Sequence, residues 1–328
     1  TAVITALLLS TSSLHIYFSQ ELRPYALPAM FAAISWWALY AKRWRSFTVA
    51  TVLGLFSSYL YPFLLFSQVI WQLFIIKEKR KKLFSSLALS TALFAPWLPM
   101  FFAQLQAGQL LRQNLPGWES VVSVPQEKAL QLVFAKFMFG LSDLSLSPGY
   151  VFVALIVILS FVLLFKTYFQ KHLIKNRNLL LLLAFWAGLP LLTSWLVSWF
   201  IPVVEPKRLL FSLAGFYGLA AYLTVSATAQ KNKVGVWAGR TLIFILFTLN
   251  IWSTFNYYTN AKFQREDWRG IIGKLEQTYP SRNTLALFIF PDPFAPWRWY
   301  ADPTIQTLST KTIYITEDVE LRNLLEPA

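Results

Sequence analysis

Residues 148–165 read PGYVFVALIVILSFVLLF, a run without a single charged side chain. A helix needs about 20 mostly apolar residues to cross the hydrocarbon core of a bilayer, so this stretch is close to a full span. Eight more apolar segments flank it. They lie at 2–18, 24–41, 46–59, 61–76, 84–102, 179–200, 207–226 and 236–253. The sequence therefore predicts an all-α polytopic membrane protein with about nine transmembrane helices.

The composition agrees with lipid as the solvent. Of the 328 residues, 56% are hydrophobic and 13% are charged, whereas soluble domains average about 25% charged residues. Two of the nine segments, 46–59 and 61–76, are short, and the stretch Ser57–Pro62 breaks the apolar run between them. They fit either two thin helices or one re-entrant hairpin, and in both cases the chain returns to the side that it left.

Basic residues follow the alternation of the predicted helices. The segments 42–45, 77–82, 166–178 and 227–240 hold 3, 5, 4 and 3 Lys and Arg, fifteen of the 29 in the chain. The loops of the other side, 19–24, 103–147 and 201–208, together hold six. Short cytoplasmic loops are enriched in Lys and Arg, so the first set is predicted to be cytoplasmic.

This orientation predicts a cytoplasmic (inner) membrane protein whose C-terminal region is extracytoplasmic. Glu78 is the only one of the 15 Asp and Glu in the predicted cytoplasmic loops. The net charge of +14 follows from those loops. Membrane lipid is therefore expected as a partner, and nucleic acid is not.

Two domains are expected: residues 1–253 as the transmembrane module and 254–328 as a small extracytoplasmic α/β domain. The second domain is predicted from an amphipathic helix at 264–279, strands at 284–290 and 312–316, and a last helix capped by Asp318. In the loop 103–147, an interfacial helix is expected at 126–139 with Val133, Phe134, Phe137 and Met138 on its apolar side.

Familiar catalytic motifs are missing from the sequence. It has no phosphate-binding glycine loop, no HExxH motif and no cysteine, and His15 and His172 are its only histidines. His15 is interpreted as an interfacial histidine bonded to backbone. Candidate chemistry is therefore expected from carboxylates and cations on the outer face.

The first candidate is the outer turn Ser19–Tyr25, which reads SQELRPY. It places Glu21 and Arg23 at the membrane interface, and Pro24 suits the first position of a helix. A plain surface pair between Glu21 and Arg23 that ends a helical hairpin would explain the same residues.

The second candidate is 202–208, which reads PVVEPKR. Lys207 and Arg208 are cations on the side where basic residues are scarce. We predict that they open a helix, whose free N–H groups would favour a lipid phosphate or pyrophosphate. Alternatively, Glu205 neutralises Arg208 while Lys207 extends to the headgroups.

Four segments resemble motifs of a known family. The stretch 15–27, HIYFSQELRPYAL, is similar to a motif of the bacterial glycosyltransferase family 39-like proteins, which belong to the GT-C superfamily. These proteins are relatives of protein O-mannosyltransferases and aminoarabinose transferases. The other three segments follow in order: 94–99 resembles the family's Pro-Trp-x-Pro helix end, 202–210 its Pro-x-Arg segment and 265–269 its Glu-Asp-Trp-Arg.

The resemblance implies a fold and a reaction. Such enzymes transfer a sugar from a polyprenyl-phosphate or polyprenyl-diphosphate carrier to an acceptor hydroxyl on a glycan, lipid or protein. A carboxylate in the first outer loop is the expected base, and a divalent metal cation assists some members. The chain begins at Thr1 inside an apolar run. We therefore expect it to lack the family's N-terminal helices and that first outer loop.

The resemblance assigns roles to six residues. Glu21 is expected as a second-loop acidic residue, with Gln20, Arg23 and Tyr25 beside it as substrate contacts. Lys207 and Arg208 are expected to contact the phosphate. Where members often have Thr-His-Tyr, this sequence has Ser57-Ser58-Tyr59.

Two other functions fit a polytopic membrane chain. A lipid-linked oligosaccharide flippase or other transporter would show polar residues in the middle of the membrane or paired broken helices. A non-catalytic membrane scaffold with an outer recognition domain would need neither feature. The clustering of polar residues at one face favours the transferase.

Overall fold

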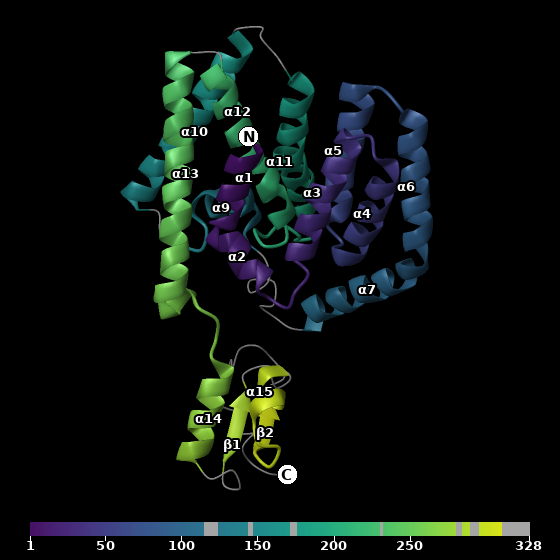
Figure 1. Ribbon diagram of the computed structural model, residues 1–328. Helices are drawn as coiled ribbons and strands as arrows, with labels where there is room; N and C mark the ends of the chain where they lie inside the picture. Colours follow the sequence, from purple (N-terminus) through teal and green to yellow (C-terminus); the bar gives the residue numbers. More distant parts are fainter. Residues whose placement is uncertain are drawn as a thin grey trace. The chain divides into compact units, whose positions relative to one another are not determined.

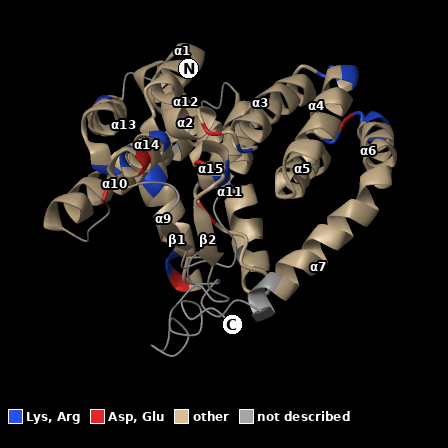
Figure 2. Cartoon of the chain, turned by 90° about the horizontal axis from the view of Figure 1, so that it is seen from below, with Lys and Arg blue, Asp and Glu red and all other residues tan. Residues whose placement is uncertain are grey.

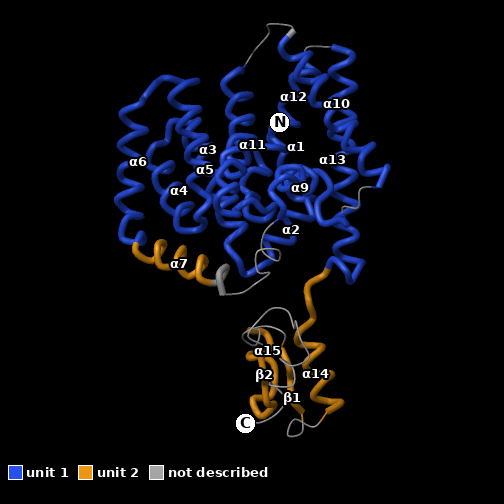
Figure 3. Tube along the Cα trace, turned by 180° about the vertical axis from the view of Figure 1, so that it is seen from behind, with its two compact units in different colours: residues 1–98, 124–263 blue, residues 99–123, 264–328 orange. Residues whose placement is uncertain are grey.

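The computed structural model describes residues 1–114, 124–143, 147–170, 176–229, 232–279, 284–288 and 295–309. The chain forms two compact units, which Figure 3 colours separately. Unit 1 comprises residues 1–98 and 124–263, and unit 2 comprises residues 99–123 and 264–328. The boundary predicted after residue 253 falls inside the last helix of unit 1, and residues 99–123 group with the C-terminal residues.

Unit 1 is a helical bundle (Figure 1). Its helices are α1 (Ala2–Ser10), α2 (Ser13–Ser19), α3 (Ala26–Tyr40), α4 (Trp44–Ser57), α5 (Tyr61–Ile70), α6 (Arg80–Phe94), α9 (Gln126–Phe139), α10 (Pro148–Gln170), α11 (Arg177–Ser198), α12 (Leu213–Ala229) and α13 (Lys233–Thr259). A π-helical turn, η1 (Trp71–Ile76), continues α5. Three single 3₁₀ turns are η2 (Ala95–Trp97), η3 (Leu210–Ser212) and η4 (Ala261–Phe263).

Fewer helices than predicted are long enough to span a bilayer. Five helical stretches in the described residues have the length and apolar character required: Arg80–Leu110, Pro148–Phe169, Arg177–Ser198, Leu210–Ala229 and Lys233–Thr259. The count is six if the bent pair α1 and α2 is one span. The chain is therefore a helical membrane protein, but the predicted count of nine spans is not confirmed. The 15 residues of α3 extend only about 22 Å, short of the roughly 30 Å core.

The predicted first span, 2–18, is broken in two. The axes of α1 and α2 differ by 66°. The break falls in a run of four hydroxyl residues, 10–13, where the Ser10 and Thr11 hydroxyls donate to the Leu7 carbonyl over 3.1 and 2.7 Å. Such bonds compete with the helical ladder and bend helices.

Helix α13 satisfies the carbonyl groups that the break releases. The Asn250 side chain donates to the Leu8 carbonyl over 3.0 Å, and the Thr254 hydroxyl donates to the Thr11 carbonyl over 2.8 Å. Asn250 also accepts a hydrogen bond from the Tyr217 hydroxyl on α12. Buried backbone groups without partners cost free energy, so these bonds stabilise the bent conformation.

Tryptophans fill the centre of unit 1 around α12, whose residues are mostly buried. Trp36 stacks on Trp186 at a ring distance of 6.1 Å, and Trp71 meets Trp36 edge-on. The Trp186 ring N–H donates to the Phe211 carbonyl over 2.7 Å. This bond holds η3 against α11.

Helix α9 forms where the sequence predicts a helix, but its surroundings differ. Its apolar residues Val133, Phe137 and Met138 are buried inside unit 1, and α9 packs on α11 and α13. The predicted interfacial placement is therefore wrong for this face, because protein rather than headgroups covers it.

The loops of unit 1 gather at two opposite ends. At one end, Lys42 donates to Glu78 over 2.8 Å, joining the α3–α4 loop to the segment between η1 and α6. This contact lowers the pKa of the Glu78 carboxyl. At the other end, residues 24–25 and 56–60, together with Val203 and Arg208, line one cavity. Helix α3 connects the two ends, so the basic loops 42–45 and 77–82 lie opposite the loop 19–25.

This arrangement predicts that the two ends face opposite sides of the membrane. The chain has no cysteine, so Lys79→Cys and Arg23→Cys each introduce one label site. In sealed inside-out vesicles, a membrane-impermeant maleimide should label the Lys79→Cys variant readily. It should label the Arg23→Cys variant only after permeabilisation. Equal labelling of both variants before permeabilisation would reject the spanning arrangement.

In unit 2, the described residues form α7 (Leu98–Asn114, which begins in unit 1), α14 (Trp268–Thr278), α15 (Ala295–Tyr300) and strands β1 (Leu285–Phe288) and β2 (Gln306–Ser309). The strands pair in parallel. Ile272, Trp297 and Ile305 form the small core. The predicted amphipathic helix is present, capped by Asp267, but Ile271 and Leu275 on its predicted apolar face are exposed. The predicted strand 312–316 and the Asp318 cap lie outside the described residues.

Candidate functional site

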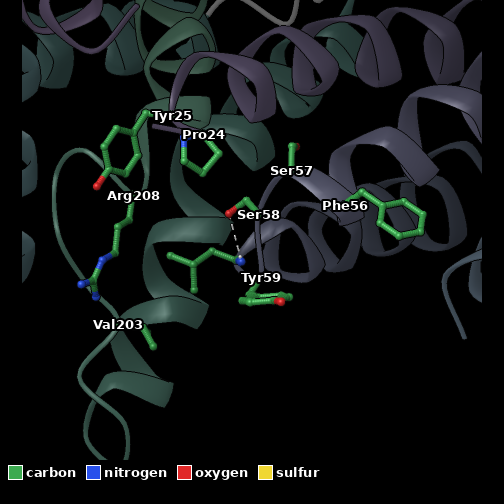
Figure 4. A pocket seen from close by; sticks show the side chains of 9 residues that line it. Pro24, Tyr25, Phe56, Ser57, Ser58, Tyr59, Val203 and Arg208 are labelled. Atoms are coloured by element: carbon green, nitrogen blue, oxygen red, sulfur yellow. Dashed lines mark hydrogen bonds between the residues drawn. The ribbon is translucent and has the colours of Figure 1, made fainter. Parts of the chain in front are cut away.

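Three segments that are far apart in the sequence line one cavity at the end of unit 1 opposite the basic loops (Figure 4). The cavity has a volume of about 450 Å³. It is lined by Pro24, Tyr25, Phe56, Ser57, Ser58, Tyr59, Leu60, Val203 and Arg208. Arg208 is the only charged side chain among them, so one cation faces a largely apolar and hydroxyl-bearing wall.

The turn between α4 and α5 presents the two serines. The Ser57 hydroxyl donates to the Gly54 carbonyl over 2.8 Å, which closes the last turn of α4. Ser58 is extended, with φ −158° and ψ 130°, and its oxygen accepts from the Leu60 N–H over 3.2 Å. Proline lies at the start of α5, where its missing N–H costs nothing. The sequence therefore stops and restarts the helix here.

The segment after α11 forms a tight turn. The Ser198 hydroxyl oxygen accepts hydrogen bonds from the N–H groups of Val203 and Val204 over 3.0 and 3.3 Å. Val204 is buried, whereas the Val203 side chain lines the cavity. The two hydrogen bonds to Ser198 at the end of α11 and the burial of Val204 therefore fix the turn.

Lys207 and Arg208 do not open a helix, which corrects the prediction. They lie in turns, followed by η3, and α12 begins only at Leu213. The Arg208 N–H is already bonded to the Glu205 carbonyl over 3.0 Å. The two cations are therefore not at a helix N-terminus, and the Arg208 N–H is not free to bind an anion.

Glu205 pairs with both cations. Its carboxylate lies 2.7 Å from the Lys207 ammonium and 3.2 Å from Arg208 Nε. Arg208 Nη1 donates to the Pro202 carbonyl over 3.4 Å. These contacts orient the guanidinium and leave Nη2 without a protein partner among the described residues. Lys207 does not line the cavity.

Glu21 and Arg23 form an ion pair of 3.3 Å beside the cavity rather than in its wall. The Tyr25 hydroxyl raises the pKa of the Arg23 guanidinium, and the carboxylates of Glu21 and Glu205 act in the same direction. The loop 19–25 and the turn 202–208 are therefore close enough to interact electrostatically. One oxygen of the Glu21 carboxylate is buried without a hydrogen-bond partner.

Gln20 has a different contact from the one expected. Its side-chain oxygen accepts from the Tyr257 hydroxyl of α13 over 2.8 Å, and Tyr257 packs edge-on against Tyr17. Gln20 is not part of the cavity wall. It acts as an anchor that ties the loop 19–25 to α13.

The resemblance also raised a divalent metal. A metal site needs several oxygen or nitrogen ligands from the protein. No group of three or more His, Asp or Glu side chains occurs within the described residues. Among the described residues, Glu21 and Glu205 are the carboxylates near the cavity. Both are paired with cations, so this pair does not fit a metal ligand set.

The wall contains residues that the sequence analysis did not assign. Ser57, Ser58 and Tyr59 were noted only as a departure from a family motif. Trp97 lies beside them, since its ring N–H donates to the Tyr59 hydroxyl over 3.0 Å and its ring contacts Phe56. Ser57–Tyr59 could have been assigned to the site from the sequence, because they lie in a predicted turn on the same side of the membrane as residues 19–24.

No protein-family model, no curated protein and no solved structure matches the chain.

Proposed function

We propose that this protein is a glycosyltransferase that moves a sugar from a polyprenyl-phosphate or polyprenyl-diphosphate carrier to an acceptor hydroxyl at the extracytoplasmic membrane face. One observation carries the proposal. Residues from the segments 15–27 and 202–210, which resemble family motifs, line a single cavity together with Ser57–Tyr59. Trp97, from a third such segment, contacts the same wall.

The charges of the cavity suit a phosphate leaving group. The planar fork of Arg208 matches two phosphate oxygens, and its contacts to Glu205 and Pro202 pre-orient it. The Tyr25 hydroxyl can donate a further hydrogen bond. A cation aimed at the leaving oxygens stabilises the charge that develops on them as the glycosidic C–O bond breaks.

The acceptor step needs a base. The acceptor oxygen bonds to the anomeric carbon, the phosphate departs with the bonding electrons, and a carboxylate takes the hydroxyl proton. Glu205 is held between two cations, so Glu21 is the better candidate of the two described carboxylates near the cavity. In this arrangement Glu21 is paired with a single cation, Arg23.

A transporter is the second candidate, and the break between α1 and α2 is the observation that favours it. Transporters build substrate sites from broken helices. Here, however, Asn250 and Thr254 occupy the Leu8 and Thr11 carbonyls that the break releases. The break therefore has the features of an internally braced bend, and the transferase remains the proposal.

Filling the cavity tests the transferase. Val203→Trp adds an indole to a wall of a cavity of about 450 Å³, and it should lower transfer from a polyprenyl-phosphate sugar by more than about tenfold. Val203→Thr keeps the shape of the side chain and should retain most activity. The assay is transfer of radiolabelled sugar in proteoliposomes of the full-length protein. Wild-type transfer by Val203→Trp would remove this cavity from the reaction, whereas transbilayer movement of the donor without transfer would favour the transporter.

A further inference from the structure

The end of unit 1 opposite the cavity carries a dense group of cations, here called the basic cluster. Its members are Lys42, Arg43, Arg45, Lys77, Lys79, Arg80, Lys81 and Lys82, and all are exposed. The two segments that contain them, 42–45 and 77–82, hold one carboxylate, Glu78. The Lys42–Glu78 contact joins the two segments. Figure 2 shows the blue stretches and a red one near α4 and α6.

The basic cluster is locally unfavourable without an anion. Lys42, Lys77 and Lys79 have φ values of 57°, 60° and 54°, in the left-handed region that favours glycine. Arg80–Lys82 occupy the first turn of α6, which has no acidic residue. Cations at a helix N-terminus are repelled by its dipole. A bound anionic surface would offset the repulsion, whereas the backbone strain is a property of the lysine positions themselves.

The neighbourhood indicates what kind of anion fits. Large exposed aromatic side chains lie next to the cations along the chain: Trp37, Tyr40, Phe74 and Phe84. The Arg43 guanidinium lies 5.1 Å from the centre of the Trp37 ring. Aromatic rings beside exposed apolar helix faces are typical of the membrane–water interface. A phospholipid supplies both the acyl chains for these faces and the phosphate for the cations.

We propose that the basic cluster binds the headgroups of anionic phospholipids and concentrates them at the α3–α6 end of the bundle. The two other basic segments, 166–178 and 227–240, are longer and hold only four and three Lys and Arg. The cluster is thus a local binding surface rather than an even distribution of charge. This inference is independent of the proposed glycosyl transfer.

A double variant with opposite effects on stability and binding tests the proposal. Lys77→Gly/Lys79→Gly removes two charges but leaves the Lys42–Glu78 contact. Each cation near an anionic surface strengthens lipid binding, so the loss of two cations should weaken binding on the order of tenfold. We expect phosphatidylglycerol to bind the full-length protein about tenfold more weakly, as measured by native mass spectrometry from detergent. The Tm in phosphatidylcholine should be unchanged or higher, because glycine relieves the left-handed strain.

The matched control is Lys233→Gln/Arg240→Gln, which removes two exposed charges from α13 at another basic segment. It should weaken phosphatidylglycerol binding less than about threefold, since each lost cation would contribute less outside the cluster. Lys77→Arg/Lys79→Arg should bind as the wild type does. Wild-type binding by the glycine variant, an equal loss in the control, or displacement of the lipid by equimolar inorganic phosphate would overturn the proposal. If the glycine variant does not fold, Lys81→Gln/Lys82→Gln, exposed on α6, carries the same expectation.

Discussion

Arg208→Ala should reduce donor-dependent glycosyl transfer by at least about a hundredfold. Charged hydrogen bonds contribute about 1.5–3 kcal/mol each, and 1.4 kcal/mol corresponds to a factor of ten. The guanidinium is the one cation in the cavity wall, so no described neighbour in that wall replaces its charge. Arg208→Lys keeps the charge but loses the fork, and the expected loss is roughly ten- to a hundredfold. The measurement is kcat/KM for a polyprenyl-phosphate sugar in proteoliposomes at matched protein amounts.

Lys207→Ala is the matched control for Arg208. It removes a neighbouring cation that pairs with the same Glu205 but does not line the cavity. A partly exposed pair of this kind contributes at most about 1 kcal/mol, so transfer should change less than about fivefold. Wild-type activity in Arg208→Ala would exclude this residue from the site. Equal losses in both variants would point to a general effect of net charge.

Gly140→Ala should destabilise the protein by about 2–4 kcal/mol. Gly140 has φ 63° and ψ −141°, a region that is essentially restricted to glycine. An added methyl group would overlap the Ser13 hydroxyl and crowd Ser253. These two serines share a hydrogen bond of 2.6 Å, and the Leu141 N–H donates to Ser13 over 2.9 Å. The substitution therefore disrupts the contact between α2, α13 and the turn after α9.

The control is Gly188→Ala on α11, where an added methyl group meets no atom within 4 Å. Alanine is the better helix former, so this variant should be neutral or slightly stabilising. Thermal unfolding in detergent should show Tm lower by roughly 5–15 °C for Gly140→Ala and unchanged or higher for Gly188→Ala. An unchanged Tm in Gly140→Ala would contradict the packing described around Ser13.

Hydropathy and charge predicted most of the bundle, because both depend on local composition. The helices at 148–165 and 236–253 are present and longer than predicted, and the one at 179–200 is present but begins and ends two residues earlier. The basic segments 42–45 and 77–82 lie together. The nine-span count was not confirmed, since apolar composition does not show whether a helix reaches full length. The break at residues 10–13 had a signal, four consecutive hydroxyl residues, but its geometry depends on side chains from α13.

The candidate site was predictable only in part. Tyr25 and Arg208 were identified from their segments and line one cavity. Lys207 and Gln20 were expected as substrate contacts. In the structure, Lys207 pairs with Glu205, and Gln20 accepts a hydrogen bond from Tyr257. Ser57–Leu60 became part of the wall because α4 and α5 pack against their neighbours. Sequence periodicity predicts which face of a helix is apolar, but it does not predict which loops meet across a bundle.

The hydrogen bonds between α13 and the α1–α2 break also have a consequence for biosynthesis. Asn250 and Leu8 are 242 positions apart, and Thr254 and Thr11 are 243. At a translation rate of about 5–20 residues per second, α13 leaves the ribosome roughly 12–50 seconds after α1. During that interval the Leu8 and Thr11 carbonyls are without these partners. Helices α1 and α2 therefore enter the bilayer in an immature state, and the nascent chain can complete their packing only after α13 has been inserted.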